Sequence, residues 1–393
     1  MRVGVRVLGN DSDENASLDN VPRKTSIFLD MANVIRMAKQ VVRGLPYLEK
    51  EVTRRLSVQT GRTVATPSTY YVIFSGKCNL ACTFCTIYKE REPILTEEIM
   101  HRIVRESKEL SKRGFNVSLS GGEPTIFKPI YSTLELAQKL GVNFGFTTNG
   151  IALTKPNVER LLSYDPFNIN LSLESVDPAV NESVRPMAGG TARTLAGIDN
   201  LLAEKARIGS RVSLIVKPTI LEQNYRTLPA LVRHFGRNSQ VQINFQPYVG
   251  KRGDPHWVQD LNALRAVMDE LRGLHAEGYP IIGGDDIFKN FFDYLSNPPT
   301  DGDMRFLDLG GEKRNCDIGY RTMGIYPNGD VFLCELLRKP VGNIHRQSLS
   351  EIYYGNDSNR ARGIMVSCNI DCQRTCQRPT PLLSKAKAFM RMG

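Results

Sequence analysis

The sequence lacks two features that direct a chain to or across a membrane. No apolar run approaches the roughly 20 residues that a membrane-spanning helix needs. The first residues, MRVGVRVLGNDSDENASLDN, are polar and contain no apolar stretch of the kind found in a secretory signal peptide. We therefore expect a cytoplasmic location, where the eight cysteines stay reduced and serve metal binding or catalysis rather than disulfides.

A nucleic-acid-binding module is also missing. Lys and Arg number 51 against 41 Asp and Glu, which gives a net charge of +10. This surplus favours anionic partners, but no basic cluster is interleaved with aromatic residues. A solvated basic surface explains the charge without a specific nucleic acid, and it leaves room for an anionic substrate.

Strands and helices alternate regularly from about residue 68. Strand-like segments such as YYVIFS (70–75) and NVSLS (116–120) each precede a segment of helical spacing, and six such pairs follow one another. This order implies a parallel sheet with right-handed crossovers. Six units are too few to close an eightfold barrel. The expected α/β fold is therefore a partial (β/α)6 TIM-like barrel, with ligands at the carboxyl ends of its strands.

The segments that flank this barrel have a different pattern. Apolar residues recur at helical spacing between Phe28 and Leu45, which predicts an amphipathic helix over 27–56. Such a helix either packs its apolar face on the main domain or makes a peripheral contact with a membrane surface. The predicted organisation is a disordered tail 1–25, a helical segment 26–67, a barrel 68–280, a linker or helix 281–304, a cysteine-rich unit 305–380 and a basic tail 381–393.

Three cysteines, Cys78, Cys82 and Cys85, lie within KCNLACTFCTIY (77–88), just after the first strand. A 4Fe-4S cluster takes one thiolate per iron, so three thiolates leave one iron open to a small chelating ligand. A zinc ion would need a fourth ligand, and the nearest histidine, His101, lies within the following helix. Three unrelated buried cysteines explain this spacing less well.

The C-x3-C-x2-C spacing, with the aromatic Phe84 before the third cysteine, resembles that of radical S-adenosylmethionine (radical SAM) enzymes. The resemblance continues over residues 70–250 and implies that Phe84 covers one side of the site. SLSGGEPTIF, at the end of the second strand, is similar to the GGEP stretch of that family and contains Gly121, Gly122, Glu123 and Pro124. The resemblance implies that backbone carbonyls of this stretch bind the amino group of S-adenosylmethionine, while Glu123 and Pro124 fix the turn.

Further cofactor contacts are implied by the same resemblance. Asn149 lies in TTNG at the end of the third strand, and Ser172 and Glu174 stand where the family often has Ser-x-Asp, near the ribose hydroxyls. Arg185 matches an arginine that often pairs with the carboxylate of the cofactor, with a surface ion pair as the alternative. Asn224 is a similar candidate, with a helix cap as its alternative.

The resemblance also implies a mechanism. An external donor of the flavodoxin or ferredoxin type reduces the cluster, and S-adenosylmethionine is cleaved to methionine and a 5'-deoxyadenosyl radical. The radical abstracts a hydrogen atom from an unactivated C–H bond, while the protein positions the substrate and excludes water. The sequence identifies no general base.

The other five cysteines form two groups after residue 300. NCDIGYRTMGIYPNGDVFLC resembles the opening of the SPASM and twitch extensions of radical enzymes, with a hairpin signal at Asn328-Gly329 between Cys316 and Cys334. The second group, SCNIDCQRTC, contains Cys368, Cys372 and Cys376. Five thiols suffice for one auxiliary 4Fe-4S cluster, which Cys372 and Cys376 are favoured to complete. A structural zinc site would use four of the same five.

The substrate is the least determined feature. Residues 1–67 are shorter and more helical than the leader-binding domain of many peptide-modifying members, so we expect a small or amphiphilic substrate. Oxidation, epimerisation or bond formation would be the net reaction. A ribosomal peptide maturase is the alternative within the superfamily, and a non-catalytic metal-binding scaffold for an acidic partner is the alternative from another class. Lys217, Asp285 and Asp286 are further candidate substrate contacts, and the two aspartates alternatively cap a helix.

Overall fold

The computed structural model describes residues 31–89, 93–237, 239–250, 253–297, 316–334, 337 and 339–366, and all structural statements concern these residues. The chain divides into two compact units at Arg43 and Gly44, and the helix α1 (Met31–Thr60) begins in the first and continues into the second. None of the described helices is long and apolar enough to cross a membrane. The second unit contains the sheet and the candidate site.

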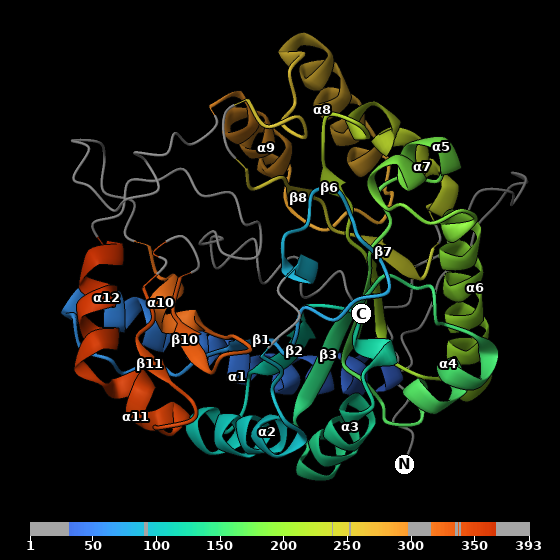
Figure 1. Ribbon diagram of the computed structural model, residues 1–393. Coiled ribbons are helices and arrows are strands. Elements are labelled where there is room, and N and C mark those ends of the chain that lie inside the picture. Colours follow the sequence, from blue (N-terminus) through green and yellow to red (C-terminus); the bar gives the residue numbers. More distant parts are fainter. Residues whose placement is uncertain are drawn as a thin grey trace, which may run out of the picture. The chain divides into compact units, whose positions relative to one another are not determined.

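Six parallel strands lie side by side in this sheet (Figure 1), in the spatial order β1-β2-β3-β4-β5-β7, which ends at the sheet edge with β7. They are β1 (Thr69–Ile73), β2 (Asn116–Ser120), β3 (Asn143–Thr148), β4 (Asn168–Leu171), β5 (Ser213–Val216) and β7 (Val241–Ile243). Each strand pairs in parallel with the next, which confirms the expected α/β partial barrel. Parallel pairing requires a crossover between strands, and the alternating helices of the sequence supply it.

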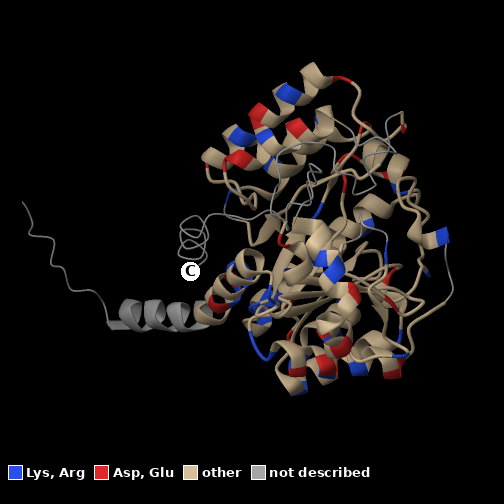
Figure 2. Cartoon of the chain, turned by 90° about the vertical axis from the view of Figure 1, so that its left-hand side faces the viewer, with Lys and Arg blue, Asp and Glu red and all other residues tan. Residues whose placement is uncertain are grey.

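The helices that follow these strands are α2 (Glu97–Ser111), α3 (Pro129–Leu140), α4 (Lys155–Leu162), α6 (Gly190–Ile208), α7 (Leu228–Phe235) and α8 (Leu261–Ala276), and α9 (Asp286–Ser296) comes next. Local chemistry sets their ends. The Thr96 side chain caps α2 by accepting from the Ile99 N–H, and Gly141 ends α3 with a left-handed backbone of φ 62°. Basic and acidic residues are interspersed along the helices in Figure 2, as expected of a solvated surface.

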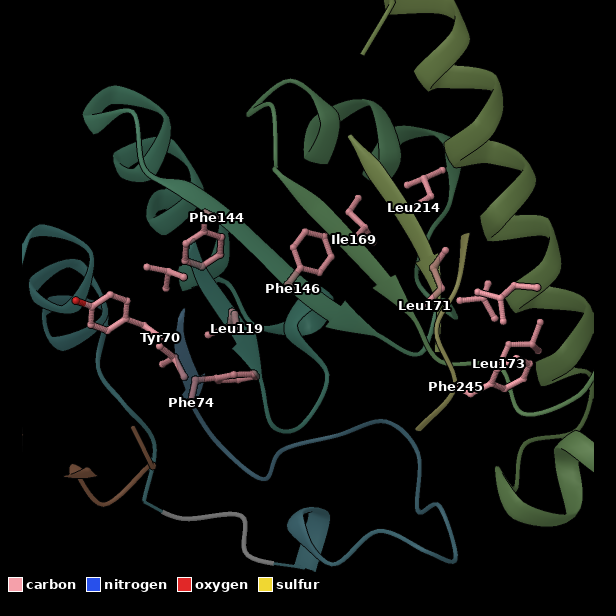
Figure 3. Close-up of a cluster of buried hydrophobic side chains, with 14 of the residues drawn as sticks. Tyr70, Phe74, Leu119, Phe144, Phe146, Ile169, Leu171, Leu173, Leu214 and Phe245 are labelled. Atoms are coloured by element: carbon pink, nitrogen blue, oxygen red, sulfur yellow. The ribbon is translucent and has the colours of Figure 1, made fainter. Parts of the chain in front are cut away.

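The core lies between the sheet and these helices (Figure 3). Alternate residues of each strand point into it, and Phe146, Ile169 and Leu214 come from three neighbouring strands and are fully buried. Burial of apolar area at about 25 cal/mol per Å² is the main stabilising contribution of such a core. A rigid sheet of this kind holds the loops at its carboxyl edge in fixed positions.

The region after residue 316 extends the same sheet. It contains α10 (Ile318–Arg321), β9 (Thr322–Ile325), β10 (Asp330–Phe332), β11 (Gly342–Asn343), α11 (Leu349–Tyr354) and α12 (Asn356–Val366). The β9–β10 hairpin turns at Asn328-Gly329, as the sequence predicts, with Gly329 at φ 85°. β9 then pairs in parallel with β1, from Thr69 opposite Thr322 to Val72 opposite Ile325. This long-range pairing is not visible in the sequence.

Several small elements are also absent from the sequence prediction. A short helix α5 (Pro178–Val184) begins at Asp177, whose carboxylate accepts from the Ala179 N–H. A two-stranded parallel sheet forms from β6 (Thr219–Ile220) and β8 (Gln246–Pro247), beyond the ends of β5 and β7. The 3-10 turns are η1 (Ile87–Lys89), η2 (Pro124–Ile126) and η3 (Tyr225–Thr227). All of these lie in loops that follow strands, where the site is expected.

Within the second unit, α1 packs with its polar face inward. Lys50, Glu51, Arg54 and Ser57 are buried, whereas Leu45, Leu48, Val52 and Leu56 are each more than 40% exposed. Of the two alternatives for this helix, packing of the apolar face on the main domain does not hold for residues 44–60. Buried polar partners explain the orientation, because Arg54 pairs with Glu51 and Asp317, and Lys50 donates to main-chain carbonyls.

Candidate active site

The loop after β1 carries the three cysteines. Cys82 is buried, and Cys78 and Cys85 are half-buried. The Leu80 N–H points at Cys78 Sγ across 3.4 Å, and the Cys85 N–H donates to the Cys82 carbonyl at 3.1 Å. The Thr83 N–H donates to Val184 at the end of α5, which ties the loop to a second element. The loop is thus held in one conformation by main-chain bonds.

The GGEP turn after β2 holds the start of this loop. The Gly122 N–H donates to the Ser75 carbonyl at 2.7 Å, and the Glu123 N–H donates to the Lys77 carbonyl at 2.9 Å. A Cβ atom at Gly122 would lie 1.7 Å from the Lys77 carbonyl oxygen, so only glycine fits there. Gly121 has φ 123°, a conformation that residues with a Cβ rarely adopt. The two glycines bring the turn directly against the thiol-bearing loop.

Glu123 is fully occupied by contacts inside the fold. Its carboxylate accepts from the Thr125 N–H and hydroxyl, from the Thr148 hydroxyl at 2.7 Å and from the Asn149 N–H at 2.7 Å. Burial raises the pKa of Glu123, and these hydrogen bonds oppose the shift. Pro124 follows as the buried first residue of η2. Glu123 therefore ties the ends of β2 and β3 together.

Asn149 connects the end of β3 to the thiol loop. Its side-chain amide donates to Asn79 Oδ1 at 2.7 Å and lies 4.0 Å from Cys78 Sγ. Ser172, half-buried at the end of β4, lies beside β3 because its N–H donates to the Thr148 carbonyl. Asn79 and Thr148 were not singled out from the sequence. Thr148 lies in the TTNG stretch and Asn79 follows Cys78, so position next to a motif was the available signal.

Glu174 and Asn224 form a buried network beyond β4. One Glu174 carboxylate oxygen accepts from Arg185, and the other accepts from the Thr219 N–H at 2.6 Å. The Asn224 amide donates to the carbonyls of Glu174 and Thr219, and its oxygen accepts from the Leu221 N–H. Both side chains are therefore hydrogen-bonded within the protein, and their contact with the cofactor stays a prediction. Asn224 starts η3 but makes no side-chain cap bond.

Arg185 reaches from this network to the thiols. Its Nε donates to Glu174 at 3.0 Å, and its Nη1 points at Cys82 Sγ across 3.5 Å. The guanidinium also lies 5.4 Å from the centre of the Phe84 ring. The alternative of a surface ion pair is excluded because the Arg185 side chain is only 12% exposed. The structure directs this arginine at a cysteine sulfur.

The rings of His256 and Tyr248 extend the aromatic contacts of Phe84. The Phe84 and His256 rings are 6.3 Å apart, and the His256 and Tyr248 rings are 5.7 Å apart. His256 Nδ1 contacts Gln223 Oε1 at 3.0 Å, and the Tyr248 hydroxyl donates to Asp254 at 2.9 Å. Sequence reasoning missed Tyr248 and His256, since they lie more than 160 positions from the cysteines.

The donor set fits a 4Fe-4S cluster better than a single metal ion. Among the described residues, no three His, Cys, Asp or Glu side chains converge on one ion, whereas a cluster takes one thiolate per iron. His101 contacts Ser132 and Glu97 on the helices, away from the triplet. Burial raises the pKa of Cys82 to about 11, against the opposing charge of Arg185, so binding of a cluster by this thiol would release a proton.

Cys316 and Cys334 lie at the opposite end of the strands from the triplet. Cys316 precedes α10, and Cys334 follows the end of β10 that pairs with Gly324 in β9. Both are half-buried and pack against the core. Because β9 is parallel to β1, these positions flank the amino end of β9, whereas the triplet follows the carboxyl end of β1. Cys368, Cys372 and Cys376 lie outside the described residues.

Three weaker candidates have separate positions. Lys217 is half-buried directly after β5, and its N–H donates to the Leu171 carbonyl. The Asp285 side chain is 86% exposed and contacts His275 Nδ1 at 3.2 Å, without capping α9. Asp286 is the first residue of α9. Their contact with a substrate stays a prediction.

Comparison with known families agrees with this site. A model described as the Radical SAM superfamily matches residues 72–233, and one named SPASM, described as an iron-sulfur cluster-binding domain, matches residues 316–378. The chain therefore belongs to the radical SAM superfamily and carries a SPASM region after the barrel. The first match includes the thiol loop, the GGEP turn and Arg185, and the second includes all five remaining cysteines.

Individual proteins provide further comparisons. Mycofactocin maturase MftC of Mycolicibacterium smegmatis is 26% identical over 260 residues, covering 65% of this chain and 61% of that protein, so the chain spans less than two thirds of that relative. The AdoMet-dependent heme synthase of Methanosarcina barkeri is 28% identical over 294 residues, covering 70% and 79%. The solved structure of Streptococcus suis SuiB bound to precursor peptide SuiA has a TM-score of 0.58 and 19% identity, covering 92% and 79%, and shares the fold.

Proposed function

We propose that this chain is a radical SAM enzyme that modifies a peptide. The observation that carries the radical chemistry is the thiol loop, in which three cysteines are held against the GGEP turn by bonds from Gly122 and Glu123. A similar maturase and a similar structure titled as a precursor-peptide complex favour a peptide over the small or amphiphilic substrate expected from the sequence. The net reaction is an oxidation, an epimerisation or a bond formation.

Each part of the site has a role in this proposal. Cys78, Cys82 and Cys85 would hold a 4Fe-4S cluster with one open iron, which, when reduced by a flavodoxin or ferredoxin and loaded with S-adenosylmethionine, supplies a 5'-deoxyadenosyl radical. The backbone of the GGEP turn would receive the amino group of the cofactor. Glu123 and Asn149 keep the ends of β2 and β3 in register with the loop. Phe84, whose ring lies 5.4 Å from the Arg185 guanidinium, would cover the thiols on one side.

The SPASM region would hold one auxiliary 4Fe-4S cluster. Cys316 and Cys334 are its proposed ligands within the described residues, and Cys372 and Cys376 would complete the set, with Cys368 spare. The positions of Cys316 and Cys334 at the amino end of β9 favour a role at a distance, such as accepting an electron from the substrate. A zinc ion bound by four of these thiols is the competing arrangement.

The first experiment measures S-adenosylmethionine cleavage by anaerobically reconstituted protein reduced with dithionite. We expect 5'-deoxyadenosine and about eight iron per chain, as two four-iron clusters require. Cys82→Ala should abolish the product and about half of the iron, whereas Cys334→Ala should lose a similar amount of iron and keep the product. Absence of product, with zinc bound in place of iron, would support the scaffold and end the proposal.

The peptide assignment needs its own test. Peptides encoded by short open reading frames beside the gene should increase 5'-deoxyadenosine formation and change mass in the reaction. An iron porphyrin is the matched alternative, because one relative is a heme synthase. Stimulation by the porphyrin, with every peptide unchanged in mass, would overturn the peptide substrate and leave the radical chemistry intact.

We also propose that α1 makes peripheral contact with a membrane. Its apolar residues Leu45, Leu48, Val52 and Leu56 share one exposed face. Interfacial helices bury such a face at the boundary between headgroups and acyl chains. Co-sedimentation of the full chain with vesicles containing phosphatidylserine should decrease in Leu48→Asp/Val52→Asp. Equal binding by both proteins, or binding by neither, would overturn this contact.

A further inference from the structure

Arg185 makes a contact that cofactor binding does not explain. We propose that Arg185 raises the reduction potential of the cluster held by the triplet, because its positive charge lies next to the ligand atom Cys82 Sγ. Glu174 is the positioning residue that aims the guanidinium and limits its effect. This inference rests on the proposed 4Fe-4S cluster at the triplet.

The geometry fixes the direction of the guanidinium. Nε and Nη2 of Arg185 both contact the same Glu174 oxygen, so Nη1 is left to point at Cys82 Sγ across 3.5 Å. Glu174 is fully buried, and the Thr219 N–H and the Asn224 amide hold it in turn. Phe84 lies beside the guanidinium at 5.4 Å. The contacts of Glu174 with Arg185, Thr219 and Asn224 thus orient one N–H donor of Arg185 toward the Cys82 sulfur.

The electrostatic consequence has a definite sign. Reduction adds one electron to the cluster, so a nearby positive charge stabilises the reduced state more than the oxidised state. Hydrogen bonds to ligand sulfurs act in the same direction and are among the factors that set cluster potentials. Glu174 carries the opposite charge next to Arg185 and partly cancels its field. Removing the charge of Arg185 should therefore lower the reduction potential, and removing the charge of Glu174 should raise it.

The role differs from that implied by the family resemblance, in which this arginine pairs with the carboxylate of S-adenosylmethionine. A contact with the cofactor affects the potential only when the cofactor is present. A contact with Cys82 acts on the cluster alone. The two roles are separated by measuring the potential without S-adenosylmethionine.

The test is a redox titration of the reconstituted cluster, followed by electron paramagnetic resonance, in the absence of S-adenosylmethionine. Cys334→Ala serves as the background, so that the triplet cluster gives the signal. We expect Arg185→Met to lower the ratio of reduced to oxidised cluster at a fixed potential on the order of tenfold. Glu174→Gln should raise that ratio. Arg207→Met removes a surface partner of Glu204 and should leave it unchanged.

Iron content distinguishes the failure of this inference from failure of the proposed function. A parent protein that binds no cluster at the triplet overturns the proposed function. If Arg185→Met and Glu174→Gln both load the cluster and both keep the potential of the parent protein, the proposed role of Arg185 is overturned. If Arg185→Met does not load, Arg185→Lys and Glu174→Gln carry the test. Because lysine keeps the positive charge, Arg185→Lys should lower the potential only slightly. Glu174→Gln should raise the potential by a larger amount.

Discussion

Two groups of buried charge border the same sheet and differ in what their charges face. The α1 cluster consists of Lys50, Glu51, Arg54 and Asp317, and its charges meet one another or main-chain carbonyls. The thiol cluster consists of Glu174, Arg185 and Cys82, and one guanidinium nitrogen faces a sulfur that is a proposed metal ligand. Both groups are largely shielded from water, so burial alone does not distinguish structure from function.

The difference lies in which partner completes each group. The α1 cluster closes within the protein and joins α1 to Asp317, next to Cys316, which assigns it to the fold. The thiol cluster ends on a loop that the fold already holds through main-chain bonds, so its charge is not needed to place that loop. A buried charge that contacts a proposed metal-ligand atom is therefore a better indicator of function than a buried charge that contacts only other groups of the fold.

The largest effect on the triplet cluster, its complete loss, is expected at Gly122, outside both groups, where close backbone contact positions the thiol loop. In Gly122→Ala, the new Cβ would lie 1.7 Å from the Lys77 carbonyl oxygen and must displace the thiol loop. We expect loss of the triplet cluster and a destabilisation of about 3 kcal/mol. Iron content and thermal unfolding measure both. Gly273→Ala, in α8 with no atom near the new Cβ, is the control and should keep its iron.

The next effect separates the two groups directly. Arg54→Met leaves the buried carboxylates of Glu51 and Asp317 without their partner, which should reduce the free energy of unfolding by about 3–5 kcal/mol. Chemical denaturation measures the loss. The potential of the triplet cluster should not change in the same variant. A shifted potential would contradict the assignment of the α1 cluster to the fold.

A smaller effect concerns Lys50 and pH. Burial lowers the pKa of Lys50 from 10.5 to about 8, so the unfolded chain binds more protons than the folded chain between these values. Stability from this residue should therefore rise with pH, by up to about 1 kcal/mol between pH 7 and 9. Denaturation at the two pH values measures the rise, relative to Lys50→Met, which lacks the titrating group. Equal slopes for both proteins would show that Lys50 is solvated.

The smallest effect tests the inverted orientation of α1. Leu48→Ser alters an apolar side chain that is 48% exposed, and should change the free energy of unfolding by less than about 0.5 kcal/mol. Leu214→Ser, at a fully buried position in β5, is the contrasting variant and should cost several times more. Thermal denaturation compares the two. Similar losses would place Leu48 in a packed interface.

Much of the fold was predictable because its signals are local. The strand–helix alternation, the hairpin at Asn328-Gly329 and the position of the triplet after β1 all follow from periodicity and turn residues within short windows. The pairing of β9 with β1 was not predictable, since it joins residues about 250 positions apart. The inward polar face of α1 was also missed, because Asp317 is the distant partner that makes it favourable.

The site divides in the same way. The sequence by itself determined which chemical groups the site contains, namely three thiols and a tight glycine turn. Cysteine spacing and the GGEP stretch are local features, and they follow two adjacent parallel strands. Only the tertiary structure determined that Glu174 and Asn224 are engaged inside the protein, and that Arg185 points at Cys82. These contacts join residues up to 103 positions apart, and their geometry exists only once the sheet has brought the loops at its carboxyl edge together.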